Sequence, residues 1–427
     1  MPFASIAWTL IAVLGALIVL LGWALWSLTH IRPGRWETLE RTQQPGARHG
    51  ALSAGLCLTE LVAGNRVRLL SNGQGFWPEV QAAIKQAQQS VHFETYLWET
   101  GSLSASLVAA LCARAQAGVA VRMVIDAVGG MDMSEQERRR LRDSGVELGF
   151  FRPPSWRNVG TYNGRDHRKM VIVDSQVAFV GGHCVTDNWL GDAEDLAHYR
   201  DLSVQLEGPL VRQVQAAFAE NWNEVSGALL ADEQLFPDLP VLGTCRGHLA
   251  YISFERRAST VKTLHMLAIC SAQHSITIQN PYFLPDKSAQ EALAKAVARG
   301  VRVRVMTPTL EAIDSTLVVR AMRHQLADLL RTGVEVYGYE QTLLHQKVLV
   351  IDGYWSIIGS TNFDFRSFEI NEEMSLSLFE PSLAEELAAT FEADLSACRR
   401  YTSAELAHRS WLDKVLDCGA FALRKQL

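Results

Sequence analysis

The feature that most constrains this chain is a motif that occurs once in each half of it. The pattern His-x-Lys-x-x-x-x-Asp begins the runs HRKMVIVD and HQKVLVID, whose apolar residues are typical of buried strands. The motif residues are His167, Lys169 and Asp174 in the first copy and His345, Lys347 and Asp352 in the second. A chain that repeats this spacing at matching places is expected to contain two similar structural units.

The segments before each motif also correspond. In the first half, the hydrophobic pattern predicts helices over 78–90 and 107–118 and strands over 91–99, 119–130 and 145–151. In the second half, it predicts helices over 261–273 and 289–300 and a long helical stretch that ends at Leu330. It also predicts strands over 275–286, 301–308 and 333–340. This alternation predicts βαβ units and two similar α/β lobes, each a mostly parallel or mixed sheet flanked by helices.

The periodic pattern also suggests where the lobes begin and end. We expect them to span 66–225 and 249–400, with a linker over 226–248, where the periodicity is lost and two prolines stand. A further linker is expected over 31–65, and a C-terminal amphipathic helix over 401–427.

The N-terminal segment carries no charged residue between Phe3 and Leu28. A helix of this length crosses a hydrocarbon core of about 30 Å, so we expect one transmembrane helix within residues 1–30. A cleaved signal peptide is the alternative, but its basic start and its Ala-x-Ala site are missing. Arginines follow the segment and no Lys or Arg precedes it, which predicts a single-pass protein whose large C-terminal part is cytoplasmic.

Charge and cysteine content exclude other classes of protein. The formal net charge of −6 does not give the basic field with which proteins hold duplex nucleic acid, so no nucleic-acid partner is expected. The seven cysteines are scattered without a Cys-x-x-Cys pair, which predicts neither a disulfide framework nor a zinc site. Hydrophobic residues make up 48% of the chain and charged residues 20%, which excludes a disordered protein.

The motif places two kinds of side chain on one face of its strand. Residues two apart share a face, so each histidine projects together with its lysine, whereas the aspartate points elsewhere. If the lobes pack about a pseudo-two-fold axis, two imidazoles and two ammonium groups meet in one cleft. This set suits phosphoryl transfer: one histidine attacks phosphorus, the lysines stabilise the non-bridging oxygens, and the second histidine protonates the leaving oxygen. Because the lysines supply the positive charge, neither a metal ion nor another cofactor is expected.

With GSTNFDFRS after the second copy, the motifs resemble those of the phospholipase D superfamily. Within it, the segments FETYLW, NPYFLPD and FDFRSFEINEE resemble the bacterial cardiolipin synthases. The resemblance implies two phospholipase D-like lobes and a covalent phosphohistidine on His167, with His345 as acid and base. It also implies a bacterial inner-membrane enzyme that makes cardiolipin and glycerol from two molecules of phosphatidylglycerol. The oligomeric state is left open.

The resemblance assigns further residues to the site. Family members orient each histidine through a carboxylate on a later strand, which by position is Asp201 in the first half and Glu373 in the second. Solvated carboxylates at strand edges are the alternative. Asn362 resembles the phosphate-binding asparagine of the family, and Ser360 would bind phosphate with it or support the residues that do. Cys184 stands at the place of Asn362 in the first half, so the phosphate site is expected to be asymmetric.

Other functions remain open at the level of sequence. With water as the acceptor, the same chemistry would give a phospholipase D hydrolase that releases phosphatidic acid. A phosphodiester nuclease of the superfamily is disfavoured by the negative net charge and by the expected anchor. A membrane scaffold with a decayed site is disfavoured because both His-Lys pairs are intact.

Some residues outside the motifs have two interpretations each. Glu94, Tyr96 and Tyr282 stand at matching strand ends, where they either line the cleft or pack in the core. The aromatic runs at 75–77 and 150–156 are either loops that enter a membrane interface or loops that pack on the protein.

The C-terminal stretch RSWLDKVLDCGAFALRKQL also has two interpretations. It places Trp411, Leu412, Val415 and Leu416 on one helical face. That face would either lie on anionic lipid or cap the second lobe.

Overall fold

The computed structural model describes residues 13–19, 21, 22, 47–155, 162–252, 259–309, 312, 315–404, 410–422 and 424. The chain divides into two compact units, Met1–Glu37 and Thr38–Leu427. In the first unit the described residues are helical. Most of the anchor expected over 1–30 therefore lies outside the described residues, and no helix within those residues is both long and apolar enough to span a membrane.

The second unit carries the repeat. Its first half contains β1 (Val62–Ser71), α3 (Asn72–Gln86), β2 (Ser90–Thr95), α4 (Ser102–Gln116), β3 (Ala120–Asp126), α5 (Glu135–Asp143), β4 (Glu147–Phe151), β5 (Met170–Val173), β6 (Val177–Gly181), η2 (Asp187–Trp189), β7 (Leu202–Glu207) and α6 (Val211–Ser226). Its second half contains β8 (Cys245–Tyr251), α7 (Thr260–Ser271), β9 (Ser275–Gln279), α8 (Lys287–Ala298), β10 (Arg302–Pro308), α9 (Thr316–Arg331), β11 (Glu335–Tyr339), β12 (Val348–Ile351), β13 (Trp355–Gly359), α10 (Phe365–Glu369), β14 (Met374–Phe379), α11 (Pro381–Asp394), η4 (Leu395–Ala397), β15 (Cys398–Arg400) and α13 (Trp411–Ala422).

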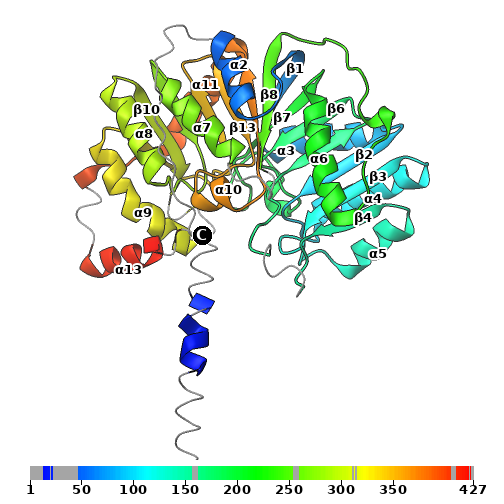
Figure 1. Ribbon diagram of the computed structural model, residues 1–427, viewed down its shortest axis with the longest axis horizontal. Coiled ribbons are helices and arrows are strands. Elements are labelled where there is room, and N and C mark those ends of the chain that lie inside the picture. The colour runs from blue at the N-terminus through cyan, green and yellow to red at the C-terminus, as the bar shows by residue number, and fades with distance from the viewer. Residues whose placement is uncertain are drawn as a thin grey trace, which may run out of the picture. The chain divides into compact units, whose positions relative to one another are not determined.

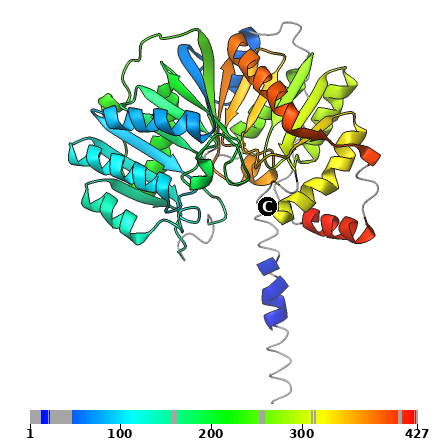
Figure 2. The same ribbon diagram turned by 180° about the vertical axis from the view of Figure 1, so that it is seen from behind.

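All the strands belong to one 15-stranded sheet, in the order β15-β11-β10-β9-β12-β13-β14-β8-β1-β7-β6-β5-β2-β3-β4. The order of the second half mirrors that of the first, and the halves join where β1 pairs antiparallel with β8. In the first half, α3 and α4 cover one face of the sheet and α6 the other; α7 and α8 lie opposite α11 in the second half (Figure 1, Figure 2). The expected pseudo-symmetric pair of α/β lobes is therefore present, fused edge to edge.

The expectation of a mostly parallel sheet is wrong, and the alternative of a mixed sheet is right. Among the named strands, parallel pairing is confined to β2-β3-β4 and β9-β10-β11, where helices connect successive strands. The motif strands β5 and β12 are followed by tight turns and return at once as β6 and β13, so they pair antiparallel. Each half thus combines a βαβ layer with an antiparallel layer that carries the motif.

Matching glycines show the repeat in the backbone itself. Gly118 and Gly300 follow α4 and α8 with φ of 89° and 90°, and Gly145 and Gly333 follow α5 and α9 with φ of 92° and 93°. This left-handed conformation is favourable for glycine and ends each helix before the next strand.

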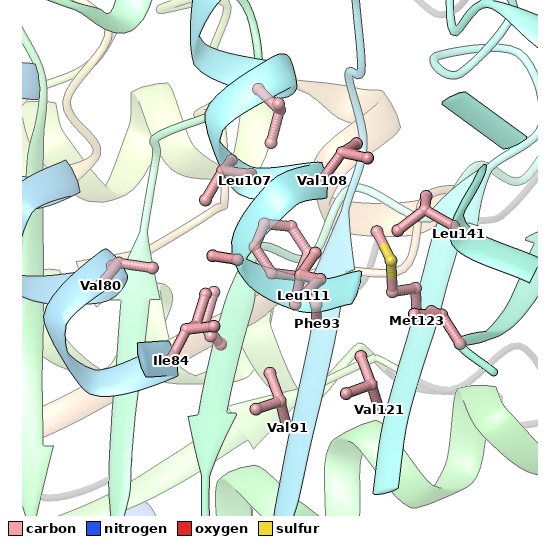
Figure 3. Packing of buried hydrophobic residues seen from close by; sticks show 14 of the residues in the cluster. Val80, Ile84, Val91, Phe93, Leu107, Val108, Leu111, Val121, Met123 and Leu141 are labelled. Atoms are coloured by element: carbon pink, nitrogen blue, oxygen red, sulfur yellow. The ribbon is translucent and has the colours of Figure 1, made fainter. Parts of the chain in front are cut away.

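One core of the first half lies between the sheet and helices α3 and α4 (Figure 3). Val80 and Ile84 of α3 point toward Phe93 of β2, which is 1% exposed. Phe76 and Trp77 belong to α3 and to this same core, so the interpretation of 75–77 as an interfacial loop is wrong. A short helix in residues expected to be a linker, α2 (Ala47–Leu56), packs against α7 and β8.

The segment expected as the link between the halves contains one short helical turn, η3 (Glu233–Leu235). Leu235 within it is buried. The segment begins after Gly227, which ends α6 in the left-handed conformation with φ of 73°. It therefore runs along the protein rather than away from it.

Candidate active site

Each motif begins just before a central strand, and its first residue forms a backbone hydrogen bond to the other half of the protein. His167 precedes β5, and its backbone N–H donates to the carbonyl oxygen of Glu372 at 2.9 Å. His345 precedes β12, and its backbone N–H donates to the carbonyl oxygen of Arg200 at 2.7 Å. These bonds tie the start of each motif strand to the chain that enters β14 or β7 in the opposite half.

This crossing brings each histidine to a carboxylate of the other half. His167 Nδ1 lies 2.8 Å from Glu373 Oε1, and His345 Nδ1 lies 2.7 Å from Asp201 Oδ2. Both carboxylates are fully buried. The expectation that each histidine pairs with the carboxylate of its own half is therefore wrong, whereas the expectation that these two carboxylates orient the two imidazoles agrees with the contacts.

A charged residue stands immediately before each of these carboxylates and holds its strand in place. Glu372 accepts hydrogen bonds from the buried guanidinium groups of Arg168 and Arg152, at 2.8 and 2.9 Å. Arg200 donates to Asp394 of α11 at 3.2 Å. Sequence reasoning missed these ion pairs because neither lies on the motif face, although the unusual run of charges next to the motif at 165–169 is a signal of them.

The two lysines lie beside the histidines, as their spacing predicts. Lys169 Nζ donates to the carbonyl oxygen of His167 at 2.7 Å, and Lys347 Nζ donates to that of His345 at 2.6 Å. Lys347 Nζ also lies 2.9 Å from His345 Nε2. Both lysines are buried, and both lower the pKa of each imidazole, so the four groups share one electrostatic environment.

The two motif aspartates point away from this cluster. Asp174 accepts hydrogen bonds from the backbone N–H groups of Gln88, Gln89 and Ser90, at 2.7 to 3.1 Å. Asp352 does the same for Gln273, His274 and Ser275, at 2.7 to 2.9 Å. Each carboxylate therefore fixes the turn before β2 or β9, and no hydrogen bond joins either of them to His167 or His345 in the described part of the chain.

The remaining predicted residues are buried. The Ser360 hydroxyl donates to Glu373 Oε2, and Asn362 keeps a buried Oδ1 without a hydrogen-bond partner in the described part of the chain. Cys184 is fully buried at the matching place of the first half, and burial raises the pKa of its thiol. The expected asymmetry between Asn362 and Cys184 is thus present in their surroundings as well as in their identities.

Aromatic side chains pack against both imidazoles. Tyr96 lies edge-on to His167 with ring centroids 5.2 Å apart, so of the two interpretations for Tyr96 the one that places it at the cleft is right. Trp189 lies edge-on to His345 at 4.9 Å, and its Nε1–H donates to Asp201 Oδ2 at 2.7 Å. Trp189 was not predicted; its place on η2, just after the first motif's glycine pair, is the only signal that the sequence offers.

Glu94 lies deeper, beneath the motif strand of the first half. It is 1% exposed, and its Oε1 accepts a hydrogen bond from Asn221 of α6 at 2.8 Å. Burial raises the pKa of Glu94 to about 7. Of its two interpretations, the core position is the one that the structure favours.

Burial controls the protonation of the site. It lowers the pKa of His345 to about 3, and it lowers that of His167, in both cases together with the motif lysines, so both imidazoles are neutral near pH 7. Burial also lowers the pKa of Lys347 to about 7. A neutral imidazole beside an ammonium group can act as a nucleophile or a base, and it can become an acid once an anionic phosphate enters.

The pKa values of the two carboxyl groups shift in opposite directions. Burial raises the pKa of Glu373 to about 8, so this carboxyl group holds a proton near neutral pH. Burial would also raise the pKa of Asp201, but the neighbouring His345 and His183 outweigh it and hold that pKa well below its usual range. The site therefore combines one neutral and one anionic carboxyl group.

Comparison with known proteins identifies a matching family and similar proteins. The family described as "Cardiolipin synthase, PLD-like domain" matches residues 80–222 and 266–395. The probable cardiolipin synthase YwiE of Bacillus subtilis (strain 168) is 32% identical over 355 residues, which cover 83% of this chain and 70% of that protein. Cardiolipin synthase A of Pseudomonas fluorescens (strain Pf-5) is 34% identical over 349 residues, which cover 81% of this chain and 71% of that protein.

A solved structure shares the fold at low sequence identity. The phosphatidylserine synthase of Haemophilus influenzae Rd KW20 matches with a TM-score of 0.69 at 12% identity, and the match covers 87% of this chain and 98% of that one. At this identity the likeness concerns the fold alone.

Proposed function

Because the chain belongs to the family of cardiolipin synthases with PLD-like domains, we propose that it makes cardiolipin by transferring a phosphatidyl group between two molecules of phosphatidylglycerol. The observation that carries this proposal is the buried cluster of two histidines and two lysines, in which each imidazole is held by a carboxylate of the opposite half. This cluster has the parts that a two-step displacement at phosphorus requires.

In the first step, one imidazole attacks the phosphorus of the first phosphatidylglycerol. A nitrogen–phosphorus bond forms and the bond from phosphorus to the glycerol oxygen breaks. The second imidazole, which gains a proton when the anionic phosphate enters, donates that proton to the oxygen as glycerol leaves. In the second step, the second imidazole takes the proton from the hydroxyl of another phosphatidylglycerol. That oxygen attacks phosphorus and the nitrogen–phosphorus bond breaks, which releases cardiolipin and returns both histidines to their starting state.

The other residues of the site are proposed to serve the phosphate and the imidazoles. Lys169 and Lys347 would hold the non-bridging oxygens as these gain charge. Asn362 would contribute its side-chain amide to the same phosphate, from the second half only. Asp201 and Glu373 would set the tautomers of the imidazoles, and the family resemblance implies that His167 carries the phosphatidyl group.

The acceptor decides between synthesis and hydrolysis. Water is present at about 55 M, so the transfer to a lipid hydroxyl requires that the site hold the acceptor and exclude water. The nearly complete burial of both imidazoles supports such exclusion, since His167 is 9% exposed and His345 6%.

The enzyme is also proposed to act at the bacterial inner membrane. The uncharged segment from Phe3 to Leu28 is long enough to cross a bilayer once, and the arginines that follow it favour a cytoplasmic position for the rest of the chain. This placement would bring the site to a membrane that contains its substrate.

Product analysis tests the proposed function. We expect the purified full chain in phosphatidylglycerol vesicles to form more cardiolipin than phosphatidic acid, as measured by thin-layer chromatography of labelled lipid. Excess glycerol should convert added cardiolipin back to phosphatidylglycerol, because the same two histidines serve both directions. Activity should persist in EDTA. Phosphatidic acid as the main product, without loss of cardiolipin to glycerol, would instead identify a hydrolase.

A further inference from the structure

Helix α13 packs against α9 through its polar side. Asp417 and Asp413 lie 3.2 and 3.6 Å from the guanidinium group of Arg320 on α9. One turn further along both helices, the ring of Phe421 lies 4.7 Å from that of His324. These contacts fix the rotation of α13 about its own axis.

The opposite side of α13 is apolar and faces away from the protein. Trp411, Val415, Leu412 and Leu416 are 76%, 58%, 52% and 45% exposed. Cys418, Gly419 and Ala422, which fall on the same side at 100° per residue, are exposed as well. Asp417, in contrast, is 1% exposed. The helix thus points acidic residues inward and large apolar residues outward.

This orientation is the reverse of that of an amphipathic helix on a water-facing surface. Such a helix buries its apolar stripe and leaves its charged residues in water. Large neighbouring apolar side chains in water are unfavourable in proportion to the apolar area that could be buried. A contiguous apolar surface of this kind indicates a site that is covered in use.

We infer that the outer face of α13, formed by Trp411, Leu412, Val415 and Leu416, lies at the boundary between headgroups and acyl chains of a phospholipid bilayer. Basic residues border this face: Lys414 is exposed on α13, and Arg424 lies just past its end with its guanidinium group over the ring of Phe421. Arginine or lysine beside a Trp- and Leu-rich face is the arrangement of helices that lie flat on anionic membranes.

The position of α13 agrees with this surface. In both views α13 lies on the same side of the second half as α10 (Figure 1, Figure 2). Helix α10 follows directly after Ser360 and Asn362 of the candidate site. A bilayer in contact with α13 would therefore lie on the side of the second half where α10 follows Ser360 and Asn362. The choice of phosphatidylglycerol as the lipid rests on the proposed function.

Two matched valine positions allow a direct test. Val415 on α13 is 58% exposed. Val241, in the segment of chain that links the two halves, is 75% exposed. Val415→Cys and Val241→Cys are each made in the full chain with Cys270, Cys398 and Cys418 replaced by serine, so that the remaining cysteines are buried. A fluorophore is attached, and the protein is reconstituted in phosphatidylglycerol vesicles that contain lipids with a nitroxide near the carbonyl end of an acyl chain.

We expect the nitroxide lipids to quench the fluorophore at position 415 at least about threefold more than at position 241, and iodide in the water to do the reverse. A thermal unfolding transition of each labelled protein in detergent that matches that of the unlabelled chain shows that it is folded. Equal quenching by lipid at the two positions would overturn the inference. So would a fluorophore at 415 that is shielded from both quenchers and becomes accessible to iodide on dilution to one chain per vesicle, which would identify a second copy of the chain as the occupant. Neither outcome depends on which lipid product the enzyme makes.

Discussion

The two histidine–carboxylate pairs have the same geometry but different surroundings. Asp201 accepts hydrogen bonds from His345, from the indole N–H of Trp189 at 2.7 Å and from the backbone N–H of Leu202 at 2.8 Å. Glu373 contacts His167 with one oxygen and accepts the Ser360 hydroxyl with the other. N–H donors around a buried carboxylate stabilise its charge, so Asp201 is anionic while burial keeps Glu373 protonated.

This difference means that the His167–Glu373 pair holds one more proton than the His345–Asp201 pair. A protonated Glu373 donates to Nδ1 of His167, which leaves the proton of this imidazole on Nε2. An anionic Asp201 accepts Nδ1–H of His345, which leaves a lone pair on Nε2. Without substrate, these protonation states would make His167 the proton donor and His345 the proton acceptor, the reverse of the roles that the family resemblance implies. If His167 is to attack first, substrate binding must move a proton between the pairs.

The largest effect is expected when one of the two histidines is removed, because only one histidine–carboxylate pair then remains. His167→Ala and His345→Ala should each lower cardiolipin formation by about 10²-fold or more, because one imidazole cannot be both nucleophile and leaving-group acid in one step. The measurement is product formed per enzyme in phosphatidylglycerol vesicles. If either variant kept more than about a tenth of the activity, the two-histidine mechanism would be wrong.

A smaller effect should separate the two carboxyl groups. Asp201→Asn removes a negative charge that stabilises the imidazolium of His345, and we expect a loss of about 10²-fold in kcat. Glu373→Gln replaces a neutral carboxyl group by a neutral amide of similar shape, and we expect a loss of less than about tenfold. The two variants are matched controls for each other, since each changes one carboxyl oxygen to an amide nitrogen. Equal losses would show that both carboxyl groups carry the same charge during the reaction.

The smallest effect concerns stability. The pKa of Glu373 rises from 4.5 to about 8 on folding, so this group contributes stability that is fully present below pH 4.5 and is lost as the pH rises through about 8. We therefore expect Glu373→Gln to lessen the decline in Tm between pH 5 and 8, measured by thermal unfolding of the full chain in detergent. Asp201→Asn should not lessen that decline, because the folded-state pKa of Asp201 lies below this window. A Glu373→Gln profile parallel to that of the unmodified protein would contradict the raised pKa.

Much of the fold could be predicted because it depends on local patterns. The alternation in 91–99 predicts β2 (Ser90–Thr95), and the matching glycines mark the same helix ends in both halves. The spacing within each motif also places a histidine and a lysine together. These features need only the period of a strand and the conformational preference of glycine.

Other features depend on contacts that a local pattern does not contain. We expect this helix to begin at Pro78, because proline is common at the first position of a helix and the residues before it resemble a loop. In the structure the helix begins at Asn72. The residues before Pro78 are helical because Trp77 donates its indole N–H to the carbonyl oxygen of Trp189, far along the chain. Likewise, strand spacing shows which face a histidine takes, but not which of two related carboxylates lies beside it.

The crossed pairs have a consequence for how the protein becomes active as it is made. His167 contacts a carboxylate 206 residues further along, and His345 contacts one 144 residues back. When the ribosome has completed the first lobe, both His167 and Asp201 exist, but each still lacks the group that it contacts in the finished protein. Contacts this distant in sequence form late in folding. A partly synthesised chain therefore cannot assemble either of the two histidine–carboxylate pairs.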